Sequence, residues 1–457
     1  MKSHRLILSA ALLWAGLGGE RGAPPVGAQV TVETGGARLS VNPEVFARRI
    51  AEEVAELRGL PFKTEPAVKH QSIEDFENYL EAELRRQLPE KRRRYFGRIV
   101  AKLGLYRGPE ITDMEAMIKA VMKSQAAAYY DPATQAFYVV MSDLPEVMMG
   151  AVYAHELYHA LQDQYFDLQA YLLDQMEGAL NDDELMARQA VVEGEATYVM
   201  TLYTTRRLLG SVPDRQMLTL AINMQTQVDT EMLRRMLKEE AVLGPLSGQL
   251  EDAVKAMDEI PPFVLETLLG AYLKGMAFVH NVQGRGWSEV EALYTTRPPA
   301  SSEQILYPEK WIAGEVPYRL AWPAFEGVEP LTDFEELDVN TLGEIQWRII
   351  FAEHGLASEG RAAAAGWDGD LYAVLKRRDS DDLLLLLYTC WDTDADAQEF
   401  AAAYDRLLAV KYAAVPEPTR LVRRGSDVLV IEGGDADDQP ALLDFLAAVT
   451  KTKPARP

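Results

Sequence analysis

Apolar residues recur at intervals of three and four through most of the first 280 positions, which is the period of an α-helix. Asn42-Pro43-Glu44 opens one amphipathic helix of this kind. Further helices are predicted over residues 73–88 and 91–103, after a short strand over residues 60–68. The first part of the chain is therefore expected to be mainly helical.

A helical region rich in methionine is predicted over residues 214–279. Methionine is a flexible apolar residue that fills irregular gaps in protein cores. We therefore expect the methionines of this region to fill the core rather than to form a binding surface. They are Met217, Met224, Met232 and Met236.

The pattern changes near residue 330. Residues 322–330 contain two X-Pro pairs, and the acidic Asp333-Phe334-Glu335-Glu336 follows, which indicates a domain boundary. Beyond it an alanine-rich helical segment leads into a ββαββα order, typical of a small α+β domain. The expected strands and helices cover residues 371–376, 383–390, 395–408, 421–424, 428–431 and 440–448.

His155-Glu156-Leu157-Tyr158-His159 carries the most specific chemical signal in the chain. Residues four apart share one helix face, so both imidazoles can reach one metal ion while Glu156 takes a proton from water. The chain has six histidines in 457 residues, and this composition yields the motif by chance in about one chain in a hundred. The alternative is a surface helix with two solvated histidines, which the surrounding Ala, Val and Leu residues disfavour.

A second helix, predicted over residues 183–208, offers the third metal ligand that two histidines and a water leave open. The other histidines have no motif around them: His4, His70, His280 and His354. Glu193 has mostly small or apolar neighbours at helical spacing, whereas Glu195 has Arg188 on its side. This favours Glu193 as the metal ligand. Glu195 is then expected either to contact one of the ligands without touching the metal or to face solvent.

These two motifs resemble the gluzincins, the zinc peptidases with HExxH on one helix and a glutamate on the next. The run from His155 to Asp163 is similar to the active helix of thermolysin-like enzymes, and Glu193-Gly194-Glu195-Ala196 to the Glu-Gly-x-Ala element of aminopeptidase gluzincins. The resemblance covers about residues 126–310. It implies a helical zincin-like catalytic domain, zinc held by His155, His159 and Glu193, Glu156 as general base, and a peptide or protein substrate.

Residues around the two motifs each allow two interpretations. Asp163 lies four positions after His159 and either accepts a ring N–H from a ligand or faces solvent. Asp131-Pro132-Ala133-Thr134 between two aromatic runs predicts a β-hairpin, which either pairs with an extended peptide at an exposed edge or belongs to the core. A donor that stabilises a developing oxyanion is sought among Tyr272, Tyr307 and His280, although aromatic residues in apolar helices are usually packing residues, which favours that role for each.

The N-terminus has the pattern of a secretory signal. Lys2 and Arg5 precede an apolar run over residues 6–17, and Val26-Gly27-Ala28 ends in small residues suited to cleavage. The run is short for a membrane span, and no other stretch is expected to reach that length. A cleaved signal peptide over residues 1–28 and a secreted or periplasmic protein are therefore predicted, with an uncleaved anchor as the alternative.

Composition excludes some partners. The chain has 46 basic and 70 acidic residues, a net charge of −24, which argues against nucleic acid and anionic membranes. Cys390 is the single cysteine, so no internal disulfide is expected. We expect a metallopeptidase domain over residues 29–335 and an α+β domain over residues 340–457, forming an exported zinc peptidase. The alternatives are a non-catalytic metal-binding scaffold and a metal-dependent hydrolase of another bond; the substrate and the oligomeric state stay open.

Overall fold

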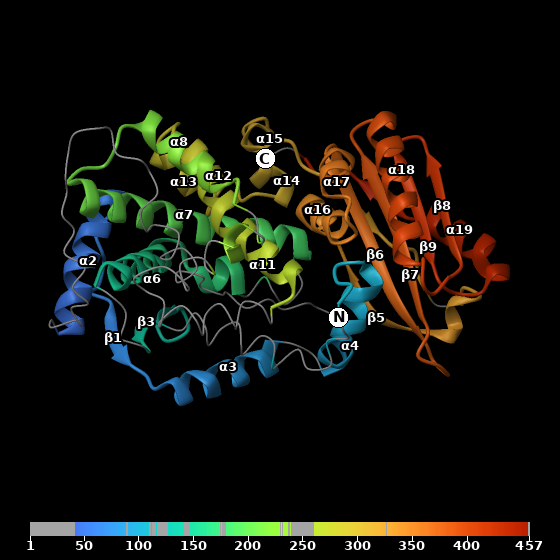
Figure 1. Cartoon of the computed structure of the whole chain (residues 1–457), viewed down its shortest axis with the longest axis horizontal. Helices are drawn as coiled ribbons and strands as arrows, with labels where there is room; N and C mark the ends of the chain where they lie inside the picture. The colour runs from blue at the N-terminus through green and yellow to red at the C-terminus, as the bar shows by residue number, and fades with distance from the viewer. Residues whose placement is uncertain are drawn as a thin grey trace.

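The computed structural model describes residues 42–87, 90–108, 127–140, 146–173, 180–228, 260–325 and 327–455, with isolated positions between these ranges. Two lobes lie side by side, a helical lobe and a lobe built on a five-stranded sheet (Figure 1). The helical lobe comes mainly from the first 320 residues and the sheet lobe from the rest, which confirms the predicted fold class. The predicted signal peptide lies outside the described residues.

The helical lobe follows the predicted periodicity closely. The helices expected from residues 43, 73, 91 and 183 are all present, each within a residue or two of its predicted start. The lobe contains α2 (Pro43–Arg58), α3 (Ile73–Gln87), α6 (Glu146–Phe166), α7 (Asp182–Leu209), α8 (Arg215–Gln225), α11 (Pro262–Leu269), the π-helix η3 (Gly270–Lys274), α12 (Gly275–Gln283), α13 (Trp287–Ala292), α14 (Ser302–Leu306) and α15 (Pro308–Ile312).

A small three-stranded sheet lies against α6. The predicted hairpin is confirmed as β2 (Ala128–Asp131) and β3 (Ala136–Val139), with the Asp131 carboxylate accepting hydrogen bonds inside the turn. β1 (Ala67–His70) pairs in parallel with β3, so the strand expected over residues 60–68 is present only at its end. The sheet order β1-β3-β2 makes β2 an edge strand and β3, which precedes α6 in sequence, the central one.

The sheet lobe contains the predicted ββαββα order. It is formed by β6 (Trp367–Arg377), β7 (Leu383–Trp391), α18 (Asp394–Lys411), β8 (Thr419–Arg424), β9 (Asp427–Glu432) and α19 (Gln439–Ala447), preceded by α16 (Gly343–Glu353) and α17 (Ala357–Ala364). The acidic segment interpreted as a boundary forms a further strand, β5 (Phe334–Asn340), which pairs with β6. Alternate residues of β7 pack against α18 on one face and α19 on the other, so its continuous leucine run is buried on both sides.

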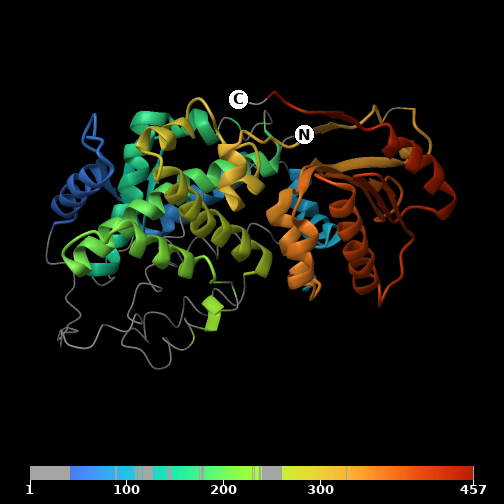
Figure 2. The same cartoon turned by 90° about the horizontal axis from the view of Figure 1, so that it is seen from above.

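The two lobes share a hydrophobic core. Helix α4 (Glu90–Leu103) precedes the metal-motif helices in sequence but packs in the sheet lobe, where Ile99, Val100 and Leu103 join the core residues of α16 and α18. At the C-terminus, β10 (Thr450–Thr452) runs back toward the helical lobe and pairs with β4 (Arg319–Ala321) (Figure 2). The boundary expected between residues 335 and 340 stays a prediction, and these contacts join the chain on either side of it.

One continuous helical segment, Pro262–Gln283, is long and apolar enough to cross a membrane, which the sequence analysis did not expect of any stretch after the N-terminus. Its most apolar window is 61% buried, and α12 packs along α7. A buried core helix of a globular protein has the same length and composition, so this segment is weak evidence for a membrane span.

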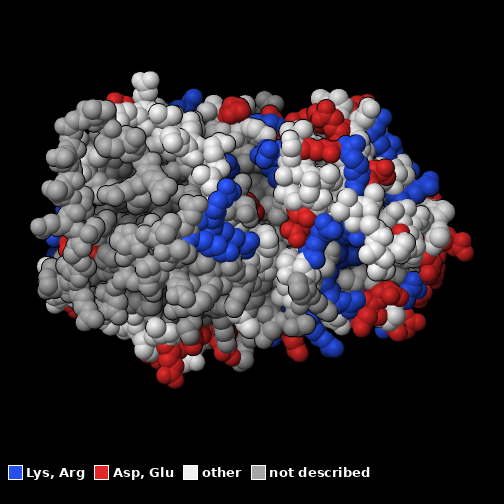
Figure 3. Space-filling view, viewed as in Figure 1, with Lys and Arg blue, Asp and Glu red and all other residues white. Residues whose placement is uncertain are grey.

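The prediction that the methionines around α8 fill the core is wrong for three of them. Met217, Met224 and Met232 are 60%, 66% and 42% exposed, and Met236 lies outside the described residues. Leu218 and Ile222 form the buried side of α8 instead. Acidic and basic side chains are interspersed over the sheet lobe on the face shown in Figure 3.

Candidate metal centre

Helix α6 is buried on all sides through the motif. Each residue from Met149 to Asp163 is buried, including His155 at 0%, Glu156 at 1% and His159 at 5% exposure. Ionisable side chains in such surroundings need partners, because an unpaired buried polar group is costly. Solvated histidines on a surface helix, the alternative weighed from the sequence, do not describe this segment.

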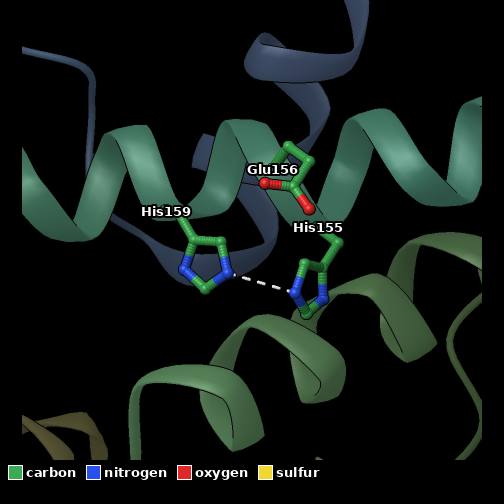
Figure 4. Close-up of side chains that lie close together, drawn as sticks. All are labelled: His155, Glu156 and His159. Carbon is green, nitrogen blue, oxygen red and sulfur yellow. Dashed lines mark hydrogen bonds between the residues drawn. The ribbon is translucent and has the colours of Figure 1, made fainter. Parts of the chain in front are cut away.

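The two histidines converge as their spacing predicts. His155 and His159 point from the same side of α6, with Glu156 above them, and their Nε2 atoms are 3.1 Å apart (Figure 4). Ligand atoms of His155, Glu156 and His159 all lie within 4.8 Å of one another. This is a buried group that can hold a metal ion.

Helix α7 brings Glu193 to the same point. Glu193 Oε2 lies 3.1 Å from His155 Nε2 and 3.4 Å from His159 Nε2, and the side chain is fully buried. Glu193 Oε1 and His155 Nδ1 have no hydrogen-bond partner among the described residues. Two imidazole nitrogens and a carboxylate oxygen therefore meet in a closed triangle, an arrangement that can hold a shared cation.

The pKa shifts of His159 and Glu193 show that a positive charge is favoured beside the Glu193 carboxylate. Burial lowers the pKa of His159, but the Glu193 carboxylate raises it by more, so this pKa is about 9. Burial raises the pKa of Glu193, yet the two imidazoles override that effect and hold the pKa below its usual value. A proton on His159 thus supplies the positive charge that the carboxylate attracts.

Glu156 is anchored from the small sheet. Its Oε2 accepts a hydrogen bond of 3.0 Å from the backbone N–H of Tyr130 in β2. Glu156 is therefore held beside the triangle, with its carboxylate between the edge strand and the two histidines.

A pair of glycines sets the depth of α7 at this point. A Cβ atom on Gly194 would lie 2.2 Å from the backbone carbonyl carbon of Gly275, and one on Gly275 would lie 2.1 Å from the carbonyl oxygen of Ala190. Backbone contacts this close exclude any side chain, so α7 and α12 cross directly beside Glu193. The glycine between the two glutamates thus has a packing role.

Glu195 differs from the sequence expectation in its partner. It is fully buried, and its Oε1 accepts a hydrogen bond of 2.9 Å from Arg58 of α2, not from Arg188. Arg188 donates to the backbone carbonyl of Tyr171 instead. Glu195 Oε2 accepts from the Tyr294 hydroxyl at 2.7 Å, so this carboxylate lies behind the triangle in a hydrogen-bonded network.

Asp163 does not contact either histidine. Its oxygens accept hydrogen bonds from the Tyr130 hydroxyl at 2.7 Å and from the backbone N–H of Leu168 at 2.8 Å. The side chain beside His159 is Gln162, whose Oε1 lies 2.8 Å from His159 Nδ1. Sequence reasoning missed Gln162, although its spacing of three from His159 and its place on an apolar face were visible signals.

The three candidates for an oxyanion donor have different neighbours in the structure. Tyr272, on the π-helix η3, stacks on His155 with ring centroids 5.7 Å apart. The hydroxyl of Tyr307 accepts from Arg348 and lies 3.2 Å from Glu344, and His280 lies 2.8 Å from the Thr219 hydroxyl. Of the three, Tyr272 is the one in contact with the triangle.

A second group of acidic side chains in the described part of the chain surrounds a lysine ammonium group. Glu303, Glu315 and Asp392 lie close enough to share a metal ion. Lys310 Nζ stands among them, at 2.6, 2.8 and 2.9 Å from the three carboxylates in that order. Burial raises the pKa of Glu303 to about 8 even so.

Comparison with known proteins reaches only the sheet lobe. Residues 330–443 match the family model described as a domain of unknown function (DUF8575). The match begins near β5 and includes none of the residues of the triangle. No curated protein and no solved structure matches the chain.

Proposed function

We propose that this protein is an exported zinc-dependent peptidase of the gluzincin type. The observation that carries the proposal is the triangle of His155 Nε2, His159 Nε2 and Glu193 Oε2, with sides of 3.1, 3.1 and 3.4 Å. In a tetrahedral zinc site with metal–ligand bonds of about 2.0–2.1 Å, any two ligand atoms lie about 3.3–3.4 Å apart. The three side chains therefore fit a zinc ion and leave a fourth position for water.

The chain's own residues divide the chemistry of peptide hydrolysis between them. Zinc, when bound, makes water more acidic and polarises a carbonyl group. Glu156 then accepts the proton of the attacking water and returns it to the leaving amine as the peptide bond breaks. The hydrogen bond from Tyr130 N–H keeps the Glu156 carboxylate beside the histidines, at the position this transfer needs.

The edge strand β2 is the proposed binding place for the peptide. Among the described residues β2 is paired on one side only, by β3, and the Tyr130 backbone N–H donates to Glu156. An extended peptide that pairs with such an edge gains main-chain hydrogen bonds independent of its sequence. Within the predicted hairpin β2 is the strand proposed for this pairing, because β3 is paired on both sides in the described sheet.

Tyr272 is the proposed donor to the developing oxyanion. Its ring stacks on that of His155, and it lies on a single π-helical turn between two α-helices. Such turns are frequent at functional sites, because the extra residue shifts a side chain out of helical register. Export is part of the proposal and is supported by the N-terminal basic residues and the apolar run that follows them.

The test pairs metal analysis with a peptidase assay on the secreted chain and on Glu156→Gln. Wild-type protein should carry about one zinc per chain. The variant should keep the zinc and lose activity by at least about a hundredfold, because it cannot accept the proton.

Three results would decide against the proposal or a part of it. Absence of zinc, both as purified and after titration, would contradict it entirely. Bound zinc without hydrolysis of any peptide or protein would favour the non-catalytic scaffold. Full activity of the Glu156→Gln variant would remove the assigned base.

A further inference from the structure

A buried network of hydrogen bonds lies directly behind the proposed ligand His159. Gln162, one turn further along α6, connects this histidine to α7, to the segment after α13 and, through Glu195, to α2. All of these contacts are buried away from solvent. The directions of the hydrogen bonds follow from which atoms are able to donate.

The orientation of the Gln162 amide is fixed by its acceptors. Gln162 Nε2 lies 3.0 Å from the carbonyl oxygen of Val192, 3.2 Å from Glu195 Oε2 and 2.7 Å from the Tyr294 hydroxyl oxygen. A carbonyl and a carboxylate only accept, and the Tyr294 hydroxyl donates its own hydrogen to Glu195 Oε2 at 2.7 Å. The amide nitrogen must therefore face these three groups, because a flipped amide would set its oxygen against other acceptors.

The same logic fixes the tautomer of His159. With the amide so oriented, Gln162 Oε1 faces His159 Nδ1 at 2.8 Å and can only accept. His159 therefore carries a proton on Nδ1 and presents the lone pair of Nε2 to His155 and Glu193 whenever the ring is neutral. That is the form a metal ligand needs.

The network has an anchor in the first helix. Arg58, only 2% exposed, donates from Nε to Glu195 Oε1 at 2.9 Å and lies over the ring of Trp287. The positive charge of Arg58 offsets the free-energy cost of burying the Glu195 carboxylate. This carboxylate accepts hydrogen bonds from both Gln162 and Tyr294. His155 has no comparable support, since its Nδ1 is without a partner in the described part of the chain.

We propose that Gln162 is a positioning residue for His159, and that Glu195, Tyr294 and Arg58 hold it in the orientation that keeps the His159 proton on Nδ1. This inference rests on the proposed function only in taking His159 as a zinc ligand. Gln162 acts through the histidine and does not touch the metal or the substrate.

The test measures zinc affinity, by competition with a chromophoric chelator, for wild type, Gln162→Leu and the control Gln164→Leu. Gln162→Leu should bind zinc about ten- to a hundredfold more weakly. Gln164 lies on the same helix but bonds to the backbone of Lys63 and Thr64, so its variant should bind zinc as wild type does. Nitrogen-15 NMR of histidine-labelled, zinc-loaded protein should show a hydrogen-bonded Nδ1–H on His159 that Gln162→Leu loses.

The outcomes separate this inference from the proposed function. Wild-type protein that takes up no zinc overturns both. Normal zinc binding with equal affinities for wild type and Gln162→Leu, and an unchanged Nδ1–H signal, overturns this inference alone. If Gln162→Leu does not fold, Tyr294→Phe decides: it keeps the ring stacked on Phe166 but removes the hydroxyl next to the amide. Unchanged zinc affinity in that variant overturns the inference, and a loss of about twofold to tenfold supports it.

Discussion

Two groups of ligand-capable side chains in the described part of the chain look alike by proximity and differ in the charge among them. Glu303, Glu315 and Asp392 surround the ammonium group of Lys310, which bonds to all three. In the described part of the chain Glu193 has no lysine or arginine partner, and its ion-pair partners are His155 and His159. Closeness of ligand atoms alone therefore does not distinguish the two groups; the buried group without a lysine or arginine partner among the described residues is the one that can hold a metal ion.

The largest expected difference between the two groups appears when one carboxylate is removed from each. Glu193→Ala should weaken zinc binding about a thousandfold, since each ligand supplies a large share of the binding free energy. Asp392→Ala should leave the zinc affinity unchanged, because Lys310 already occupies that group. Chelator competition on both variants is the measurement, and zinc loss from Asp392→Ala would reverse the assignment of the two groups.

The proton on His159 gives the site a distinct pH dependence. Zinc must displace this proton, so zinc affinity should rise about tenfold per pH unit and level off near the His159 pKa of about 9. The sign follows from the raised pKa: the metal-free pair of His159 and Glu193 is stable at low pH and loses its attraction as the pH rises through 9. Competition titrations from about pH 6.5 to about pH 9.5 test this, and a flat profile would contradict it.

The position of Glu193 depends on the crossing of α7 and α12. Gly194→Ala should lower the free energy of unfolding by about 2–3 kcal/mol, because its Cβ would overlap the backbone of Gly275. Gly270→Ala is a control on the helical segment that contains Gly275, where the nearest atoms to a Cβ are 3.9 Å away on Ile345. Denaturant unfolding compares the two, and equal stabilities would show that the crossing adapts.

The smallest expected effect concerns the cation of the second group. Lys310→Met keeps the apolar stem but leaves three carboxylates without their shared partner, one of which, Glu303, is almost fully buried. We expect a loss of about 1–2 kcal/mol in the free energy of unfolding, since the other two carboxylates are partly solvated. Thermal unfolding is the measurement; an unchanged melting temperature would show that Lys310 is not needed to neutralise the group.

Much of the fold and of the candidate site could be predicted because it depends on local periodicity. The spacing of His155 and His159 places both imidazoles on one helix face, and the small neighbours of Glu193 direct it inward. The ββαββα order likewise follows from short apolar runs separated by turns. In each case the deciding residues lie within one or two helical turns or one hairpin of each other.

Only the tertiary structure decided which distant groups meet. Glu195 pairs with Arg58 from the first helix, and Gln162 bonds to Tyr294, a partner that no spacing in the sequence indicates. The exposed Met217 and Met224 and the packing of α4 in the sheet lobe show the same limit, because helical periodicity marks an apolar face without saying what covers it. A pattern along the chain fixes the direction of a side chain relative to its own helix, whereas its partner depends on how whole elements pack.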